Sequence, residues 1–375
     1  MSVEGRCDER FLKVKELFQG FLDSGAELGA SICVNIDGKN VIDLWGGWAD
    51  QERTKPWTEN TIVNVWSTTK TVLSLATLIL ADRGLLGLDD PVAKYWPEFA
   101  AEGKSDVKVR HLLSHTSGLS GWDDPIDIEG VEDVPSASAK LAAQRPWWEP
   151  GTASGYHALT MGHLLQPVIQ AASGKTLGQV VNQEIAGPLK ADFSVGCPES
   201  EWHRVAKVVP PAHMDLSQID PKSVMAKTLS NPLLDAKASW TDEWKRVEMG
   251  ALNGHGNARS VCKMLSAITL GGEVDGQRLL SPATIDRIWE TQSNGTDLVL
   301  GIEVRFGIGY CLEAPILKWL PKGKVCFWGG WGGSIVVMDL DKKITFAYTM
   351  NHMEQGTIGN SRSSAYVAAL YEALS

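Results

Sequence analysis

Residues 32–45 read ICVNIDGKNVIDLW and carry the pattern that decides the fold. Apolar side chains at every second position up to Ile36 alternate with small or polar residues, as in a half-buried strand. Asp37-Gly38 is a turn-forming pair, and the apolar residues that follow up to Trp45 return as a second strand. The stretch therefore predicts a β-hairpin and, with it, an antiparallel sheet.

A second hairpin is predicted near the other end of the chain. Residues 335–338 form an apolar run, residues 339–342 read DLDK and supply a turn, and residues 344–350 read as the returning strand. Helices are predicted outside both hairpins, because residues 8–24 carry Phe and Val at helical spacing and residues 361–374 are rich in Ala. Both ends of the chain thus supply a helix and antiparallel strands.

The middle of the chain has a mostly helical pattern, broken by loops rich in Pro, Gly and Asp. We therefore predict an α/β fold of the α+β kind, in which an antiparallel sheet is flanked by the terminal helices and carries an inserted, mostly helical region. The predicted boundaries assign residues 1–85 and 291–375 to the α/β domain and residues 86–290 to the insertion. A cleft between two such regions is a natural place for an active site.

Composition narrows the possible partners. The net charge of -10 disfavours binding to a phosphate backbone, so no nucleic acid is expected. No apolar stretch is long enough to span a bilayer, the N-terminus lacks the apolar core of a signal peptide, and the six Cys include no C-x-x-C pair. These features predict a cytoplasmic protein with free thiols. The 15 Trp residues are mostly expected in the core, although Trp also suits the lining of an apolar pocket.

Residues 64–76 read NVWSTTKTVLSLA and bring together a candidate nucleophile and base. Ser67 starts an apolar helical run, and Lys70 follows three positions later, so one helical turn places both on the same face. A Ser hydroxyl needs a base to remove its proton, and a desolvated Lys can do so. From this pattern alone, a catalytic role and a helix N-cap explain Ser67 equally well.

The S-x-x-K pattern occurs three times in the chain, which limits its value when it stands alone. Ser105 and Lys108 lie in a charged stretch, where a solvated loop is the better interpretation. Ser260 and Lys263 also begin a helical pattern and compete with Ser67 as the site of the nucleophile.

Two further segments could face a cleft. Tyr156 follows a Pro-Gly turn on a loop of small residues, although an ordinary half-buried Tyr is the better interpretation when this segment stands alone. Residues 327–334 read FWGGWGGS, and their four glycines would let the backbone approach another molecule closely. Backbone N–H groups in such a segment could form an oxyanion hole, and a bulged strand edge is the simpler alternative.

Taken together, these segments resemble the motifs of one known superfamily, that of the class C β-lactamases and family VIII carboxylesterases. The resemblance covers about residues 8–374 and rests on the joint order of three motifs: Ser67 with Lys70, Pro150-Gly151-Thr152 with Tyr156, and Trp328-Gly329-Gly330. Residues 84–92, 111–119 and 254–260 resemble further segments of the same superfamily.

The resemblance implies a role for each motif. Ser67 would be the nucleophile, and Lys70 and Tyr156 would share the proton transfers. The backbone N–H groups of Ser67 and Trp331 would form the oxyanion hole, and Ser260 lies in a segment that does not carry the nucleophile. Substrate binding is further implied for the residues of the third motif: Trp328, Gly329 and Gly330.

Two departures from the β-lactamase pattern favour the esterase branch. β-Lactamases of this group typically carry Lys-Thr-Gly or a His-containing variant at the third motif, whereas Trp328 stands in first place here. A Lys there would help to bind a substrate carboxylate, and Trp cannot. The expected Tyr-x-Asn also reads Tyr156-His157-Ala158, without the Asn that would contact a substrate amide.

We therefore predict a serine carboxylesterase that hydrolyses small to medium apolar esters through a Ser67 acyl-enzyme. The alternatives are an acyltransferase on the same fold, a β-lactamase or D-amino-acid peptidase, and a non-catalytic relative. No His is spaced with Asp, Glu or Cys for a metal site, so no metal and no other cofactor are predicted. Residues 199–250, with Trp202, Trp240 and Trp244, are expected to fold over the cleft.

Overall fold

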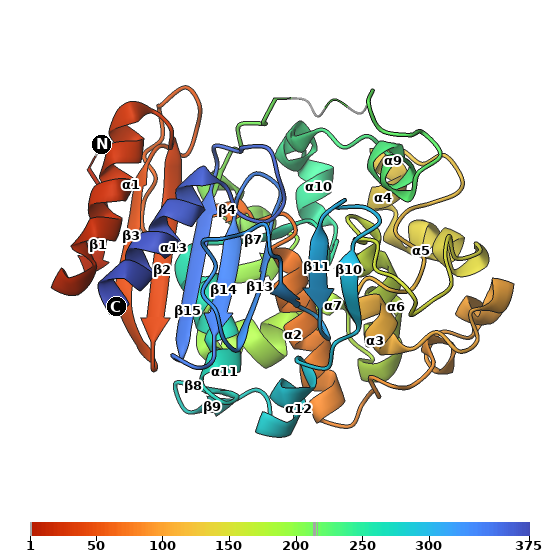
Figure 1. Cartoon of the computed structure of the whole chain (residues 1–375). Coiled ribbons are helices and arrows are strands. Elements are labelled where there is room, and N and C mark those ends of the chain that lie inside the picture. The colour runs from red at the N-terminus through yellow and green to blue at the C-terminus, as the bar shows by residue number, and fades with distance from the viewer. Residues whose placement is uncertain (1, 213–214, 216) are drawn as a thin grey trace.

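The computed structural model describes residues 2–212, 215 and 217–375, and its main element is a sheet covered by helices (Figure 1). In the described part of the chain this sheet has nine strands, all paired antiparallel. The predicted α+β fold with an antiparallel sheet is therefore confirmed. The strands follow one another in the order β1 (Glu4–Cys7), β3 (Lys39–Gly47), β2 (Gly29–Ile36), β15 (Ile344–Met350), β14 (Ile335–Asp339), β13 (Val325–Gly329), β12 (Cys311–Glu313), β11 (Glu303–Phe306) and β10 (Ser293–Thr296).

The two predicted hairpins form the centre of this sheet. Strands β2 and β3 are joined by Asp37 and Gly38, whose φ angles of 47° and 86° match the turn that a two-residue hairpin favours. Strands β14 and β15 form the second hairpin, and β15 pairs with β2, so the two ends of the chain share one ladder. Strand β2 is buried on both of its faces, and not on one as its alternating pattern suggests, because helices cover both sides of the sheet.

Helices from both ends of the chain pack on the sheet. Helices α1 (Leu12–Ser24) and α13 (Ser361–Leu374) lie side by side on one face, and α11 (Ala258–Thr269) covers the other (Figure 1). Helix α1 ends where Gly25 adopts a left-handed φ of 77°, a conformation that glycine adopts easily. Because α11 belongs to residues 86–290 but packs on the main sheet, the two regions are closely joined, and their division at residues 85 and 290 stays a prediction.

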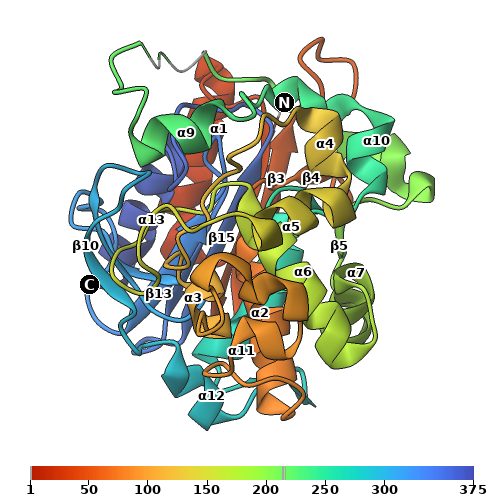
Figure 2. The same cartoon turned by 90° about the vertical axis from the view of Figure 1, so that its right-hand side faces the viewer.

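Helix α2 (Thr69–Asp82) connects the sheet to the helical region (Figure 2). It contacts α11 and β13 as well as α6 and α7, and its residues from Thr69 to Leu80 are all buried. A helix that is covered on every side can carry apolar residues all round, which explains its weak polar face. The remaining described α-helices are α3 (Val109–Leu113), α4 (Ile128–Glu132), α5 (Val134–Ala143), α6 (Thr160–Ser173), α7 (Leu177–Val181), α8 (Gly187–Leu189), α9 (Val224–Ser230), α10 (Asp242–Arg246) and α12 (Pro282–Arg287).

Two smaller sheets complete the described structure. The first lies beside the start of α2, and its strands run in the order β5 (Phe193–Val195), β7 (Gly254–Gly256), β4 (Ile62–Asn64) and β6 (Val205–Ala206). The second is the short pair β8 (Glu273–Val274) and β9 (Gln277–Arg278). Among the described residues, no helix combines the length and the apolar composition needed to cross a membrane.

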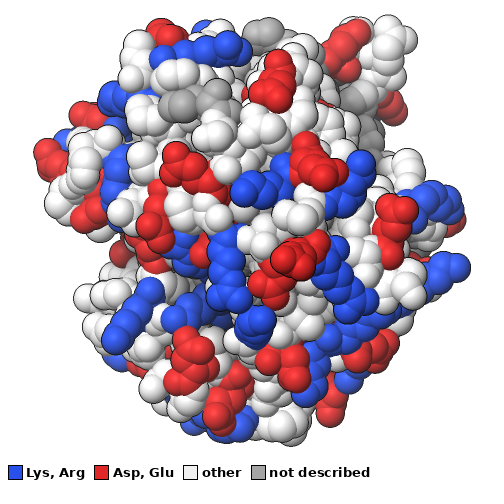
Figure 3. All heavy atoms as spheres, turned by 90° about the vertical axis from the view of Figure 1, so that its left-hand side faces the viewer, with Lys and Arg blue, Asp and Glu red and all other residues white. Residues whose placement is uncertain are grey.

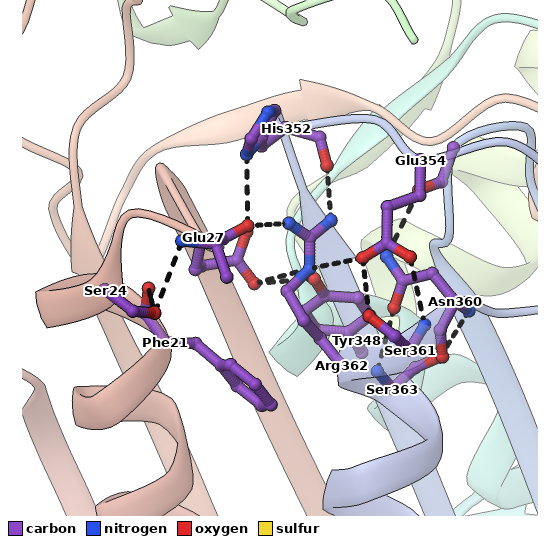
Figure 4. A network of polar contacts seen from close by, with 12 residues as sticks. Phe21, Ser24, Glu27, Tyr348, His352, Glu354, Asn360, Ser361, Arg362 and Ser363 are labelled. Carbon is purple, nitrogen blue, oxygen red and sulfur yellow. Dashed lines mark hydrogen bonds and ion pairs between the residues drawn. The ribbon is translucent and has the colours of Figure 1, made fainter. Parts of the chain in front are cut away.

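A buried network of charges joins the ends of α1, β15 and α13 (Figure 4). Glu27 and Arg362 are each only 1% exposed, and Arg362 Nε lies 3.5 Å from Glu27 Oε2 and 3.5 Å from Glu354 Oε1. The other guanidinium nitrogens donate to the backbone carbonyls of Ala26 and His352. Burial raises the pKa of Glu27 to about 7, although the charge of Arg362 acts in the opposite direction.

Arg362→Met is expected to lower the free energy of unfolding by about 3–5 kcal/mol, because Glu27 loses its buried counter-charge. The loss should grow with pH. In the variant the folded-state pKa of Glu27 is raised still further above the unfolded value of 4.5, so Glu27 folds best as the neutral acid. The contribution of Glu27 to stability is then fully present below pH 4.5 and is lost as the pH rises through 7.

Urea unfolding at pH 5 and pH 8 measures this effect. The matched control is Arg305→Met, since Arg305 is a partly exposed surface partner of Glu313 at 3.3 Å, and its loss should cost about 1 kcal/mol or less. Equal losses for Arg362→Met at the two pH values would contradict the role assigned to Glu27.

Candidate active site

Ser67 lies in the turn that leads into α2, with Lys70 one turn further along. The Lys70 Nζ is 2.9 Å from Ser67 Oγ, so the predicted neighbours are in hydrogen-bond contact. The preceding residue, Trp66, has a φ of 50°, in the left-handed region that a bulky residue rarely adopts. Strained residues of this kind cluster at functional sites, and this turn places Ser67 at the wall of a cavity.

Lys70 is buried and held by two backbone carbonyls. Its Nζ donates to the oxygens of Ala158 at 2.7 Å and Ala251 at 3.0 Å. Burial lowers the pKa of Lys70 well below its usual value. A neutral amine that gives its two hydrogens to these carbonyls turns its lone pair toward the Ser67 hydroxyl, which is the orientation of a general base.

Tyr156 lies beside both of these residues. Its ring centre lies 4.9 Å from Lys70 Nζ, and the Ser67 side chain is near enough to its hydroxyl to lower the pKa of the phenol. Trp328 Nε1 donates to the same hydroxyl at 3.3 Å. Burial raises the pKa of Tyr156 above its usual value, and the nearby polar groups of Ser67 and Trp328 only partly offset this rise. At neutral pH the phenol therefore holds its proton, whereas Lys70 is able to accept one.

Asp297 fixes the backbone of Tyr156, and sequence reasoning did not find it. Its carboxylate is buried and accepts hydrogen bonds from the backbone N–H groups of Tyr156 at 3.0 Å, Val299 at 2.9 Å and Leu300 at 2.9 Å. The bond to Tyr156 joins residues 141 positions apart, so no local sequence pattern predicts it. Asp297 thus connects the Tyr156 loop to the turn that forms one wall of the cavity.

The histidines near the site are packed and neutral. The ring of His115 lies 5.0 Å from that of Tyr156, and His157 Nε2 lies 2.6 Å from Ser117 Oγ. Burial lowers the pKa of His115 well below its usual value and that of His157 to about 4. Among the residues that the structure describes, no three His, Cys, Asp or Glu side chains are grouped so as to hold a metal ion.

The backbone N–H groups of Ser67 and Trp331 have no hydrogen-bond acceptor among the described residues. Gly330 allows the Gly-rich segment 327–334 to approach the residues before α2. A Cβ on Gly330 would lie 2.2 Å from the oxygen of Val65 and 3.2 Å from Ser67 N. Any larger residue would push the Gly-rich segment away from the start of α2. An oxyanion hole requires two free N–H donors, and these two belong to residues that line the same cavity.

Ser334 provides the link that holds these segments together. Its hydroxyl donates to the oxygen of Val65 at 2.8 Å and lies 3.0 Å from Thr68 Oγ1. The start of β14 is thereby tied to the start of α2, and both polar side chains are buried. Ser334 is visible in the sequence as the end of the Gly-rich segment, but only the pairing across 266 positions with Thr68 reveals its contact.

Ser67 opens into a cavity of about 510 Å³. None of its described lining residues is charged, and most are aliphatic. Besides Ser67 and Tyr156 the wall comprises Trp66, Ala158, Leu159, Ile219, Met225, Thr228, Leu229, Pro232, Leu233, Leu234, Leu252, Val299, Leu300, Ile302, Leu317, Trp331, Gly356, Thr357, Ile358 and Gly359. The pocket is thus aliphatic rather than rich in Trp.

The predicted site residues occupy two layers around this cavity. Trp331 lies in its wall, whereas Trp328, Gly329 and Gly330 lie outside the described lining. Trp328 reaches the site through its hydrogen bond to Tyr156. The third motif therefore contributes to the lining mainly through Trp331.

Residues 199–250 contribute to the wall, but not through their three Trp residues. Residues 219–234, on and around α9, supply seven of the described lining side chains. Trp244 is buried and packs on Trp66 with ring centres 5.5 Å apart, so it lies behind the wall. Trp202 and Trp240 donate to backbone carbonyls elsewhere and do not line the cavity.

The competing S-x-x-K pairs do not form a comparable site. Ser260 Oγ accepts a hydrogen bond from the backbone of Asp192, and Lys263 forms an ion pair with Asp275 at 2.8 Å. Ser105 is exposed, and neither pair lines the cavity.

The surface drawn in Figure 3 carries charges of both signs. Lys and Arg side chains are interspersed with Asp and Glu side chains over this face (Figure 3). An extended positive surface that could follow a phosphate backbone is not visible on it.

Comparison of the chain with known proteins identifies its family. Residues 14–370 match the family model described as Beta-lactamase. A curated relative, "Esterase/beta-lactamase LipL" of Mycobacterium tuberculosis, is 32% identical over 94% of this chain and 83% of its own length. A crystal structure of a family VIII carboxylesterase is 35% identical over the whole of both chains, with a TM-score of 0.92. A penicillin-binding protein homologue from Caulobacter crescentus is 36% identical over the whole of both chains, with a TM-score of 0.91.

Proposed function

The chain belongs to the β-lactamase family, and we propose that within this family it is a serine carboxylesterase, a carboxylic-ester hydrolase that acts on uncharged, apolar esters. The observation that carries the proposal is the contact of Ser67 with a buried Lys70, whose pKa is lowered by burial, at the wall of an uncharged cavity. Esterase and carboxylesterase are also the names given to similar proteins.

In the proposed mechanism Lys70 takes the proton of Ser67 while Ser67 Oγ attacks the ester carbonyl. The negative charge on the carbonyl oxygen is stabilised by the N–H groups of Ser67 and Trp331. Collapse of the tetrahedral intermediate expels the alcohol, which receives a proton from Tyr156, and Lys70 returns its proton to Tyr156. Water then attacks the acyl-enzyme in the reverse order of proton transfers and releases the acid and Ser67.

The cavity supports an apolar and uncharged substrate. A β-lactam or a D-alanyl peptide carries a carboxylate, which would lose its hydration in this cavity without meeting a cation among the described lining residues. The absence of Lys at Trp328 points the same way. We therefore expect β-lactamase and peptidase activity to be weaker than esterase activity.

Transfer of the acyl group to an alcohol is the second candidate function. It uses the same acyl-enzyme, and the aliphatic wall favours an alcohol over water as the acceptor. A retained Ser67–Lys70 contact disfavours the remaining alternative, a non-catalytic relative.

A panel of p-nitrophenyl esters tests the proposal. The value of kcat/KM is expected to rise about tenfold from acetate to butyrate, because each buried CH₂ contributes about 0.8 kcal/mol, and to fall again for chains too long for the cavity. An ester that ends in a carboxylate, such as p-nitrophenyl glutarate, should react at least about 100-fold more slowly than the valerate. Nitrocefin reports β-lactam hydrolysis, and added butanol reports acyl transfer.

Two variants link the chain-length profile to the cavity. In Leu229→Trp the larger side chain fills part of the cavity, so hydrolysis of the octanoate should fall more than hydrolysis of the acetate. Leu85→Trp makes the same change at a residue that is 46% exposed and outside the cavity, and should leave the profile unchanged. Faster turnover of nitrocefin or of the charged ester than of the butyrate would refute the proposed substrate class.

A further inference from the structure

The segment between β15 and α13 forms part of the cavity wall and also holds the residue after Trp331. Residues 356–359 line the cavity. The N–H of Gly332 donates to the oxygen of Gly356 at 3.0 Å, and the oxygen of Gly332 accepts from Glu354 N at 3.0 Å and Asn360 Nδ2 at 3.2 Å. Both backbone polar groups of Gly332 are thus engaged by this one segment.

These contacts bear on the direction of the Trp331 N–H. The oxygen of Gly330 accepts from the N–H of Gly333 at 3.0 Å. In a trans peptide the C=O and the following N–H point in opposite directions, so this bond turns the Trp331 N–H away from Gly333. Gly332 lies between the two ends of this bond, and its own contacts keep the turn in place. Asn360 is packed directly against it, since a Cβ on Gly333 would lie 2.0 Å from Asn360 Nδ2.

Both ends of this segment, Glu354 and Asn360, are held beside the buried charge network (Figure 4). Asn360 caps α13 by accepting a hydrogen bond from Ser363 N at 2.8 Å. The Glu354 carboxylate accepts from Ser361 Oγ at 2.8 Å and faces the Arg362 guanidinium. The same residues that begin α13 therefore hold Gly332.

We infer that Asn360 and Glu354, anchored by Arg362, are positioning residues for the oxyanion hole. Neither residue is among the described lining residues of the cavity, and they act through Gly332 on the Trp331 N–H. An oxyanion donor must lie about 2.7–3.1 Å from the developing charge. A small rotation of this peptide would therefore reduce the stabilisation of the transition state more than the binding of the ester. The inference rests on the proposed function, because it assigns these residues to the same site.

Asn360→Asp separates positioning from folding. The Asp keeps the oxygen that caps α13, but it replaces the amide that donates to Gly332 with a carboxylate that repels this carbonyl. The value of kcat should fall about tenfold to 100-fold, with KM within about twofold of wild type and the melting temperature unchanged. The pH at which activity rises should not move, since Lys70 is untouched.

Asn257→Asp is the matched control. Asn257 caps α11 through a hydrogen bond from Ser260 N at 3.0 Å, so it undergoes the same chemical change at a helix N-terminus away from Gly332. Its kcat should match wild type. A wild-type kcat in Asn360→Asp would overturn the inference, and so would equal losses in both variants, because helix capping would then explain them.

A second readout keeps the inference separate from the proposed function. A fluorophosphonate that labels Ser67 places its phosphoryl oxygen where the ester oxyanion would form. Asn360→Asp should lower the labelling rate about as much as it lowers kcat, and Asn257→Asp should not change it. If the wild type is labelled but hydrolyses no ester, the proposed function fails and the labelling rates still decide the inference.

Discussion

Ser67→Ala is expected to lower kcat/KM for p-nitrophenyl butyrate by roughly 10⁴-fold or more, to the level left by the binding site and the oxyanion donors. The hydroxyl oxygen is the atom that would form the acyl-enzyme, and Lys70 Nζ lies 2.9 Å from it. Without it Lys70 has no Ser proton to accept and no acyl-enzyme can form. The fold should remain intact, because the change removes one oxygen at the surface of an existing cavity.

The measurement combines kinetics with mass spectrometry. Wild type quenched during turnover should carry the acyl group on the peptide that contains Ser67, and the variant should carry none. Ser260→Ala is the matched control, since Ser260 is the competing S-x-x-K serine, is also buried and lies outside the described lining of the cavity. Full activity in Ser67→Ala would move the nucleophile elsewhere, and loss of activity in Ser260→Ala with a normal melting temperature would point to Ser260.

Lys70→Gln should have the second largest effect, a fall in kcat of roughly 10²–10⁴-fold, the range of general-base catalysis. Gln keeps amide hydrogens for the carbonyls of Ala158 and Ala251 but has no basic nitrogen. Tyr156 cannot take over as base, because its raised pKa keeps it protonated. In wild type, kcat/KM should fall as the pH is lowered, since Lys70 becomes protonated and can no longer accept the Ser67 proton.

The same variant should be more stable than wild type near neutral pH. The pKa of Lys70 is lowered in the folded state and is 10.5 in the unfolded chain, so between these two pKa values wild type must give up a proton on folding. Gln does not meet this cost, and its melting temperature should be higher by roughly 2 °C or more. The difference should shrink as the pH approaches 10.5. A difference that is constant with pH would contradict a neutral Lys70, because lost packing alone does not titrate.

Local pattern in the sequence determined the two central hairpins of the sheet and the terminal helices. Alternation up to Ile36, the Asp37-Gly38 pair and Gly25 act through neighbouring residues, so their effects can be read without the fold. The order of the three motifs likewise selected Ser67, Lys70 and Tyr156 as candidates. Ser67 and Lys70 are one helical turn apart, and their contact follows from helix geometry.

The tertiary structure decided everything that depends on pairs distant in the chain. The carbonyls of Ala158 and Ala251 come from segments 88 and 181 positions from Lys70, yet they orient its lone pair, and the burial that lowers its pKa comes from packing. Asp297, Ser334 and the aliphatic wall of the cavity are equally invisible in local pattern. Sequence periodicity reports how a residue is placed within its own helix or strand, whereas desolvation and the direction of a hydrogen bond arise only when separate elements meet.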